Sequence, residues 1–276
     1  MFEQHKSPAS AATLGTEMYK RNFGSNYVHA FSRHKEPTDL VLFPDEWYSG
    51  FKMPIDGKTV ALVGNAKVTD SGRAIDLYDD VIRLNYPYNW RQHPTHDGKR
   101  LDIWAGLGKY EVWQPRDFHN QHSNFFAVDL AEKVSNARSI HCISHLHVDA
   151  RFWAEINTRR LTDKFHIHWA APVVFEEIEK TSFGYDSDFL SLITRRAYLE
   201  TGYGGWPAWE ILFTGVRTLL LVAMSNPKKI GIYGMNFFSD GERTPWDMHI
   251  MHLNIEAYTR IIWLAKAIGI TVTEHN

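Results

Sequence analysis

The chain has 276 residues, of which 44% are hydrophobic and 14% aromatic, and its formal net charge at pH 7 is −2. This length and hydrophobic content suffice for one large α/β domain with a packed core, and they exclude a disordered chain. A net charge so close to zero lacks the basic footprint of a nucleic-acid-binding protein, so no nucleic-acid partner is expected.

The first 55 residues are polar and carry scattered prolines, namely Pro8, Pro37, Pro44 and Pro54. We predict that residues 1–55 form an arm that wraps a single domain at residues 56–276. The amino-terminal stretch lacks the continuous apolar segment of a signal peptide. No run of about 18 apolar residues occurs, so no transmembrane anchor is expected.

From Thr59 onward, short apolar runs alternate with helical patterns, which predicts an α/β fold with a sheet connected by crossovers. The predicted strands are Thr59–Val63, Val81–Leu84, Ile103–Gly106, Asn124–Val128, Ser139–Ser144, Phe165–His168, Lys229–Tyr233 and Thr271–Thr273. The predicted helices are Ala150–Thr158, Pro172–Thr181, Asp188–Thr201, Ala208–Ser225 and Ile250–Ile268.

The segment from Val60 to Asn85 holds the most informative pattern. One strand stops at Gly64-Asn65, a polar turn follows, and a second strand closes on Asn85. A short apolar run that ends in glycine is how an α/β sheet presents backbone N–H groups to a phosphate. The two asparagines can donate and accept hydrogen bonds without charge, which suits a nucleotide monophosphate. The alternative is an ordinary strand–turn–strand with a tight glycine.

A second pattern runs from Gly202 to Phe238. A glycine-rich loop opens a long apolar helix, and a strand ending at Gly234 follows. Helix-start N–H groups near Pro207–Trp209 would make an anion site. The alternative is a glycine loop that serves only a tight turn.

Two histidines, His249 and His252, lie directly after the second pattern. An imidazole with a pKa near the working pH suits a general base. His252 and Glu256 are four residues apart and would share a helix face, so that Glu256 could hold the imidazole. His249 would lie in the loop before the helix if the helix begins near Ile250. A histidine without a catalytic role is the alternative for each.

These segments resemble the motifs of the animal-type sialyltransferase family. The family's long motif reads roughly V-G-N, a Ser/Gly-rich loop, then I-D-x-x-D-x-V-x-R-x-N. The residues that match it in order are Val63, Gly64, Asn65, Ser71, Gly72, Ile75, Asp76, Asp80, Ile82, Arg83 and Asn85. Ile232-Tyr233-Gly234-Met235 is similar to the strand end of the family's short motif. The loop Gly204-Gly205-Trp206-Pro207 departs from the family's usual Pro-Ser/Thr-x-Gly. Because of this departure, Kdo is a candidate donor as well as sialic acid.

The resemblance implies a single-domain, three-layer α/β/α sandwich, a Rossmann-like variant of the GT-A glycosyltransferase fold. It implies an inverting, metal-independent transfer of a keto-acid sugar from a CMP-sugar donor to a glycan or glycolipid hydroxyl, with no further cofactor. His249 or His252 would be the base, supported by Glu256. The implied donor-binding residues are Gly64, Asn65, Ser71, Asn85, Gly204, Gly205, Tyr233 and Gly234. Trp104 and Trp246 are candidates for acceptor contact, with core packing as the alternative for Trp104.

Other patterns leave alternatives open. Asp186-Ser187-Asp188 is a D-x-D string that could hold a metal on a nucleoside-diphosphate sugar, although Asp188 serves equally well as a helix cap. A catalytically idle sugar- or nucleotide-binding domain is a third interpretation. The histidines around Cys142 (His141, His145 and His147, with His166 and His168) fit no standard zinc spacing.

Cys142 is the only cysteine, so no internal disulfide is possible. The animal enzymes with this motif are lumenal and disulfide-bonded. We therefore expect a reducing compartment for this chain, most simply a bacterial cytoplasm, with peripheral association at the inner membrane left open.

Overall fold

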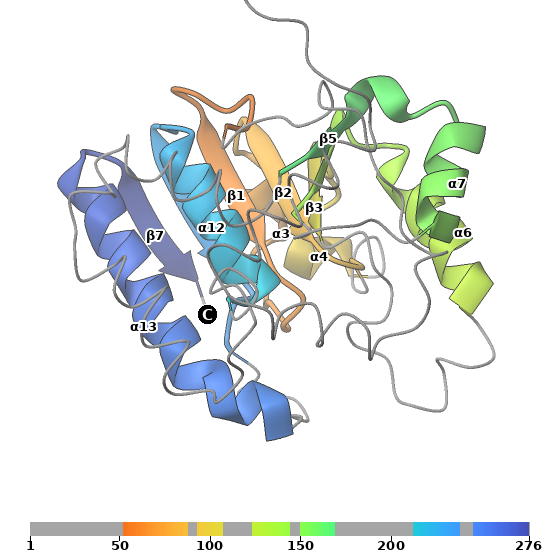
Figure 1. The fold of residues 1–276 in the computed structure, drawn as a ribbon. Coiled ribbons are helices and arrows are strands. Elements are labelled where there is room, and N and C mark those ends of the chain that lie inside the picture. The colour runs from red at the N-terminus through yellow and green to blue at the C-terminus, as the bar shows by residue number, and fades with distance from the viewer. Residues whose placement is uncertain are drawn as a thin grey trace, which may run out of the picture.

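A computed structural model describes residues 52–87, 93–106, 123–143, 150–168, 212–237 and 245–275, and the account below concerns these residues. Seven parallel strands form one sheet in the order β5-β4-β3-β2-β1-β6-β7 (Figure 1). The strands are β1 Thr59–Val63, β2 Asp80–Leu84, β3 Ile103–Gly106, β4 Ser139–Cys142, β5 Phe165–Ile167, β6 Lys229–Tyr233 and β7 Thr271–His275. The chain therefore runs outward from β1 to β5 and returns to the other side of β1 with β6 and β7.

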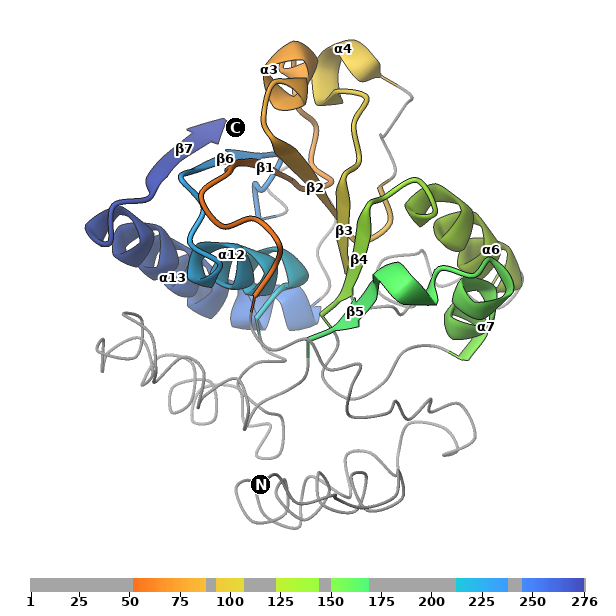
Figure 2. The same ribbon diagram turned by 90° about the horizontal axis from the view of Figure 1, so that it is seen from above.

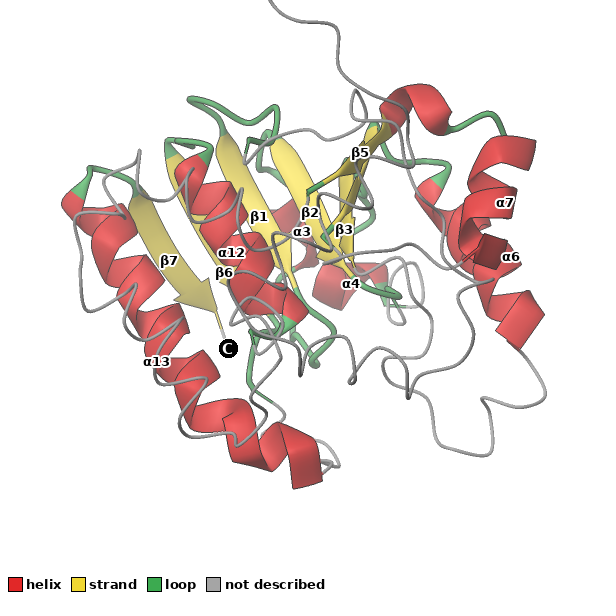
Figure 3. Ribbon diagram, viewed as in Figure 1, coloured by secondary structure: helices red, strands yellow, loops and turns green. Residues whose placement is uncertain are grey.

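Helices cover both faces of this sheet, so the predicted three-layer α/β/α architecture is confirmed (Figures 2 and 3). The helices α12 and α13 lie on one face, and α3, α4, α6 and α7 lie on the other. The bounds are α3 Gly72–Asp76, α4 Pro94–Asp97, α6 Ser123–Val134, α7 Ala150–Thr158, α12 Thr214–Met224 and α13 Pro245–Ala267, with a 3₁₀ turn at Thr162–Lys164.

Alternating side chains along the central strands explain the two layers of core. Val60 and Leu62 of β1 belong to the core cluster under α12 and α13, whereas Ala61 and Val63 pack in a second cluster with Ile75 of α3. Successive strand residues point to opposite faces, so a strand buried on both faces reads as an unbroken apolar run. This is why β1 and its neighbours were recognisable from sequence.

Three of the predicted strands have the predicted bounds, namely β1, β3 and β6, and so does helix α7. The predicted strand Asn124–Val128 is wrong, because these residues lie inside helix α6. Leu130, Ala131 and Val134 continue the apolar run at helical spacing and are buried. A five-residue apolar window could not distinguish the two structures.

Two helix starts also differ from the prediction. The helix predicted to begin at Ala208 begins at Thr214, since Leu212 and Phe213 are not helical. The helix predicted to begin at Ile250 begins at Pro245, where a proline at the first helical position costs no backbone hydrogen bond. The predicted helices Pro172–Thr181 and Asp188–Thr201 lie outside the described residues.

The segment before β1 is part of the core. Met53 is 3% and Ile55 0% exposed, and the backbone N–H of Met53 donates to the Ser225 hydroxyl at 2.8 Å. The N–H of Gly57 donates to the Asn226 carbonyl at 2.9 Å. The packed unit therefore extends at least to Met53, a few residues before the predicted boundary. Within the described residues, no helix is long and apolar enough to cross a membrane.

Candidate functional site at the carboxyl edge of the sheet

The strand order defines one distinctive place on the sheet. The chain turns to one side after β1 and to the other side at β6, so the crevice between β1 and β6 at their carboxyl ends is a topological switch point. Ligands of open α/β sheets bind in the crevice outside the strand ends at such a point. In Figure 1 this edge is the lower one, toward which the arrowhead of β7 points.

Asparagines follow three adjacent strands at this edge, namely Asn65 after β1, Asn85 after β2 and Asn236 after β6. Val63 is paired with Arg83, so continuing the register by two residues brings Asn65 level with Asn85. The expected pairing of the first two asparagines is thus matched by the strand register. Asn236 was missed, although its position two residues after Gly234 carried the same signal.

Asn85 is fixed in place by its backbone. Its φ is 50°, a left-handed conformation that asparagine tolerates better than most residues. Its N–H donates to the Ala105 carbonyl at 2.9 Å, and its own carbonyl accepts from the Trp104 indole at 2.5 Å. With its N–H bonded to Ala105 and its carbonyl to the Trp104 side chain, the side-chain amide is the group that Asn85 can offer at the edge.

Gly64 and Gly234 bring the ends of β1 and β6 unusually close together. The N–H of Gly64 donates to the Tyr233 carbonyl at 2.8 Å, and the N–H of Ala66 donates to the Gly234 carbonyl at 3.1 Å. A Cβ on Gly64 would overlap the Gly234 carbonyl oxygen, and Gly234 itself has a φ of 61°. The Gly64 N–H is therefore used within the sheet. This corrects the expectation that this N–H is presented to a phosphate.

Two further predicted contact residues are core residues. Tyr233 is 1% exposed; its hydroxyl lies 3.5 Å from that of Tyr78 and its ring stacks on His275. Burial, with the Tyr78 contact, raises the pKa of Tyr233. Trp104 is 1% exposed and packs against Phe152, so the core-packing alternative describes it.

Ser71, another predicted donor-binding residue, lies in the loop between β1 and α3. Its hydroxyl donates to the Thr69 carbonyl at 3.0 Å, and its N–H donates to the His96 carbonyl at 3.2 Å. It does not cap α3 with its side chain. The loop is thereby tied to α4 on one face of the sheet.

The charged residues of the long motif hold the fold together. The Asp76 carboxylate accepts the N–H groups of Lys99 and Arg100 at 3.0–3.1 Å. Asp80 is 1% exposed and pairs with Lys58 and Arg138 at 2.9 and 2.8 Å. Asp76 thus ties α3 to the segment before β3, and Asp80 ties β2 to the residues that precede β1 and β4.

Arg83 is buried beneath α4, the short helix that follows β2. It donates to the carbonyls of Arg100 and Asp97 at 2.7 and 2.6 Å, and its guanidinium lies 3.7 Å from the Asp97 carboxylate. Burial lowers the pKa of Arg83 to about 10, against the opposing effect of Asp97. Burial raises the pKa of Asp97, and Arg83 partly offsets this.

Helix α13 carries both candidate histidines. It begins at Pro245, so His249 lies within the helix rather than in a preceding loop, and Trp246 lies in its first turn. The Asn254 side chain accepts the N–H of Phe213 at 2.5 Å, which joins α13 to the start of α12. The first turns of α13 extend past the carboxyl edge of the sheet (Figure 1).

The spacing of His249, His252 and Glu256 is i, i+3 and i+7, so the three positions share one helix face. Glu256 is exposed, and the buried Asn254 lies on the opposite side of the helix. Gly204, Gly205, Asp186 and Asp188 lie outside the described residues, as do His145 and His147. Among the residues that are described, no group of three or more His, Cys, Asp or Glu side chains could hold a metal ion.

The fold and its edge define an open, parallel, Rossmann-like α/β domain with a polar switch point. Neither protein-family models nor curated protein sequences match the chain. Among solved structures, it is similar to the sialyltransferase CstII from Campylobacter jejuni in complex with a substrate analogue, cytidine-5'-monophosphate. That match has a TM-score of 0.43 and 15% sequence identity and covers 80% of each chain.

Proposed function

We propose that the chain is a glycosyltransferase that moves sialic acid, or a related keto-acid sugar such as Kdo, from a CMP-sugar to a hydroxyl of a glycan or glycolipid. The observation that carries the proposal is the asparagine set at the switch point. Asn65 and Asn85 come from the motif that resembles the sialyltransferase family, and the strand register brings them to one level, while Asn236 follows the neighbouring strand β6.

The chemistry of this edge supports a CMP donor in particular. CMP is a monophosphate leaving group, so neutral hydrogen-bond donors can stabilise the charge that develops on it. Asparagine amides supply such donors and also accept from ribose hydroxyls. The loop at Gly204-Gly205 is proposed to complete the donor site. The acceptor hydroxyl would attack the anomeric carbon in one inverting displacement and give its proton to a histidine of α13.

The first test is a thermal-shift titration of the full chain with CMP, CDP, UDP and GDP, each with and without Mn²⁺. A ligand at 100 times its dissociation constant adds about 2.7 kcal/mol of stability. We expect stabilisation by CMP without metal. Stabilisation only by UDP or GDP with Mn²⁺ would instead favour a transferase that uses a nucleoside-diphosphate sugar. No shift with any nucleotide would contradict both the CMP-sugar and the nucleoside-diphosphate-sugar assignments.

A matched pair of variants assigns the binding to the edge. Asn85 and Asn226 have φ values of 50° and 54°, but Asn226 precedes β6 at the opposite edge. Glycine adopts both conformations without strain, so each substitution removes mainly the side chain. We expect Asn85→Gly to weaken CMP binding about 5-fold, the equivalent of one hydrogen bond of ~1 kcal/mol. Asn226→Gly should bind as the wild type does; equal affinity in both variants would exclude Asn85 from the site.

The base is tested separately from nucleotide binding. We expect the double variant His249→Gln/His252→Gln to bind CMP normally but to transfer sugar roughly 10²–10⁴-fold more slowly, because a positioned general base contributes about that much. The readout is release of CMP from a CMP-sugar in the presence of acceptor. Unchanged transfer would remove both histidines from the mechanism.

A further inference from the structure

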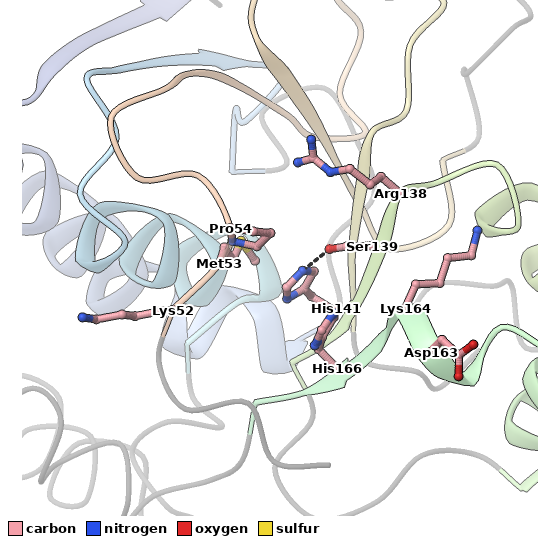
Figure 4. Close-up of a pocket in the computed structure, with 9 residues that line it drawn as sticks. All are labelled: Lys52, Met53, Pro54, Arg138, Ser139, His141, Asp163, Lys164 and His166. Carbon is pink, nitrogen blue, oxygen red and sulfur yellow. Dashed lines mark hydrogen bonds between the residues drawn. The ribbon is translucent and has the colours of Figure 1, made fainter. Parts of the chain in front are cut away.

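A second polar site lies away from the switch point, on the face of the sheet that α12 and α13 partly cover. It is a cavity of about 560 Å³, a volume within the range of small-molecule sites. Its lining comprises Lys52, Met53, Pro54, Arg138, Ser139, His141, Asp163, Lys164 and His166. Ser139 is the first residue of β4, so the cavity opens toward the amino ends of the strands. In Figure 4, Ser139, His141 and His166 occupy the middle of the lining, opposite Met53 and Pro54.

Ser139, His141 and His168 form a buried hydrogen-bonded chain along β4 and β5. The Ser139 hydroxyl is bonded to Nε2 of His141, and Nδ1 of His141 lies 2.6 Å from Nε2 of His168. The three side chains belong to residues that are 4%, 1% and 0% exposed. His166 stacks on the His141 ring, with centroids 4.8 Å apart. The imidazole of His141, the middle member of the chain, is thus fixed in its position and in the orientation of its ring.

The same surroundings keep the middle imidazole neutral and make it a weak base. Burial, followed by the neighbouring His168, His166 and Arg138, lowers the pKa of His141 well below its usual value. A neutral imidazole has one ring N–H and one acceptor nitrogen. With the proton on Nδ1, His141 donates to His168 and its Nε2 accepts from the Ser139 hydroxyl. A nucleophile bonded to a base that a third group orients is the arrangement of acyl-transfer catalysts.

We propose that Ser139 is a nucleophile with an activity separate from glycosyl transfer, in which it accepts an acyl group from a small carboxylic ester in this cavity. The Ser139 oxygen bonds to the ester carbonyl carbon while its proton passes to Nε2 of His141. The carbon–alkoxide bond then breaks, and His141 returns the proton to the departing alcohol. Water releases the acid from Ser139 by the same steps.

The lining favours a small ester that bears negative charge. Lys52 and Lys164 line the cavity together with Asp163, and the charge of the third lining cation, Arg138, is balanced by the buried Asp80. Arg138 is paired with Asp80 at 2.8 Å, and Lys164 donates to the carbonyls of Ser135 and Ala137 at 2.6 and 2.7 Å. In Figure 4 the Lys52 and Lys164 side chains point away from His141 and His166, so they set the local potential without occupying the space of the acyl group.

The test is covalent labelling of the wild-type chain with an alkyl fluorophosphonate, followed by peptide mapping. The Ser139 oxygen would displace fluoride from phosphorus and His141 would take the proton. We expect one adduct, on Ser139. Ser225 is an internal control, because it is also buried but bonds only to backbone groups, the N–H of Met53 and the carbonyl of Leu221.

Two variants separate a catalytic chain from a structural one. Ser139→Ala should abolish both the adduct and p-nitrophenol release from p-nitrophenyl acetate, and should leave CMP binding unchanged. His168→Phe retains the nucleophile but removes the acceptor for Nδ1 of His141, and should slow labelling about 10-fold or more. An unlabelled Ser139 in the folded wild-type chain, beside a serine hydrolase that is labelled in the same solution, would overturn the proposal. Equal labelling of Ser139 and Ser225 would overturn it as well.

Discussion

Replacing Gly64 with alanine is expected to destabilise the protein by about 3 kcal/mol and to abolish nucleotide binding. The added Cβ would overlap the Gly234 carbonyl oxygen and lie 3.0 Å from its carbonyl carbon and from Cγ of Met235. Because the first obstacle is backbone, side-chain rotation cannot relieve it. The ends of β1 and β6 would have to separate, and that displaces Asn65 and Asn236 together. Chemical denaturation measures the first effect, and CMP titration measures the second.

Gly57→Ala is the matched control for this substitution. Gly57 has a φ of 67°, and a Cβ there would meet nothing within 4 Å. The cost is therefore conformational only, about 1–2 kcal/mol, and CMP binding should be retained. If Gly64→Ala bound CMP as well as Gly57→Ala does, the close approach of the two strand ends would not be needed for the site.

Arg83→Met is expected to lose about 3–5 kcal/mol of stability, because it leaves the buried Asp97 carboxylate without its cation. It also removes the donors to the carbonyls of Asp97 and Arg100. Arg73→Met, the same change at an exposed position on α3, should alter stability by less than about 0.5 kcal/mol. Urea denaturation of both variants measures the difference.

The pH dependence of Arg83→Met gives a second readout. Burial already raises the pKa of Asp97 above 3.8, and loss of Arg83 raises it further. Between the unfolded and folded pKa values the folded state binds more protons, so stability falls as the pH rises through that window. The variant should therefore be relatively more stable at pH 4 than at pH 7. Adding Asp97→Asn should remove this slope and recover part of the stability; an unchanged slope would show that Asp97 is not its cause.

How much of the fold could be predicted depended on burial. The strands β1, β3 and β6 are buried on both faces, so they read as unbroken apolar runs and were located correctly. The short helices α3 and α4 were not predicted, since four or five residues carry no helical period. Their position depends on tertiary contacts, such as Asp76 with the backbone of Lys99 and Arg100.

The site could be predicted only in part, for a different reason. A motif shows which residues occur together but not whether each contacts a ligand or holds the fold. Asn65 and Asn85 reach the edge as expected, whereas Tyr233 is part of the core. The Ser139–His141–His168 chain could not be found at all, because His168 meets His141 only through the pairing of β5 with β4.

The two strands that neighbour β1 in the sheet are expected to pair with it at different stages of folding. Its ladder with β2 joins residues 20 positions apart, such as Val60 and Asp80, while its ladder with β6 joins Val63 to Tyr233 across 170 positions. Local pairings form readily, and distant ones must first overcome the entropy of closing a long loop. On the ribosome, β1 and β2 can therefore meet well before β6 has been synthesised. The crevice between β1 and β6 is among the last parts of the sheet to close, so the proposed nucleotide site forms only after β6 has paired with β1.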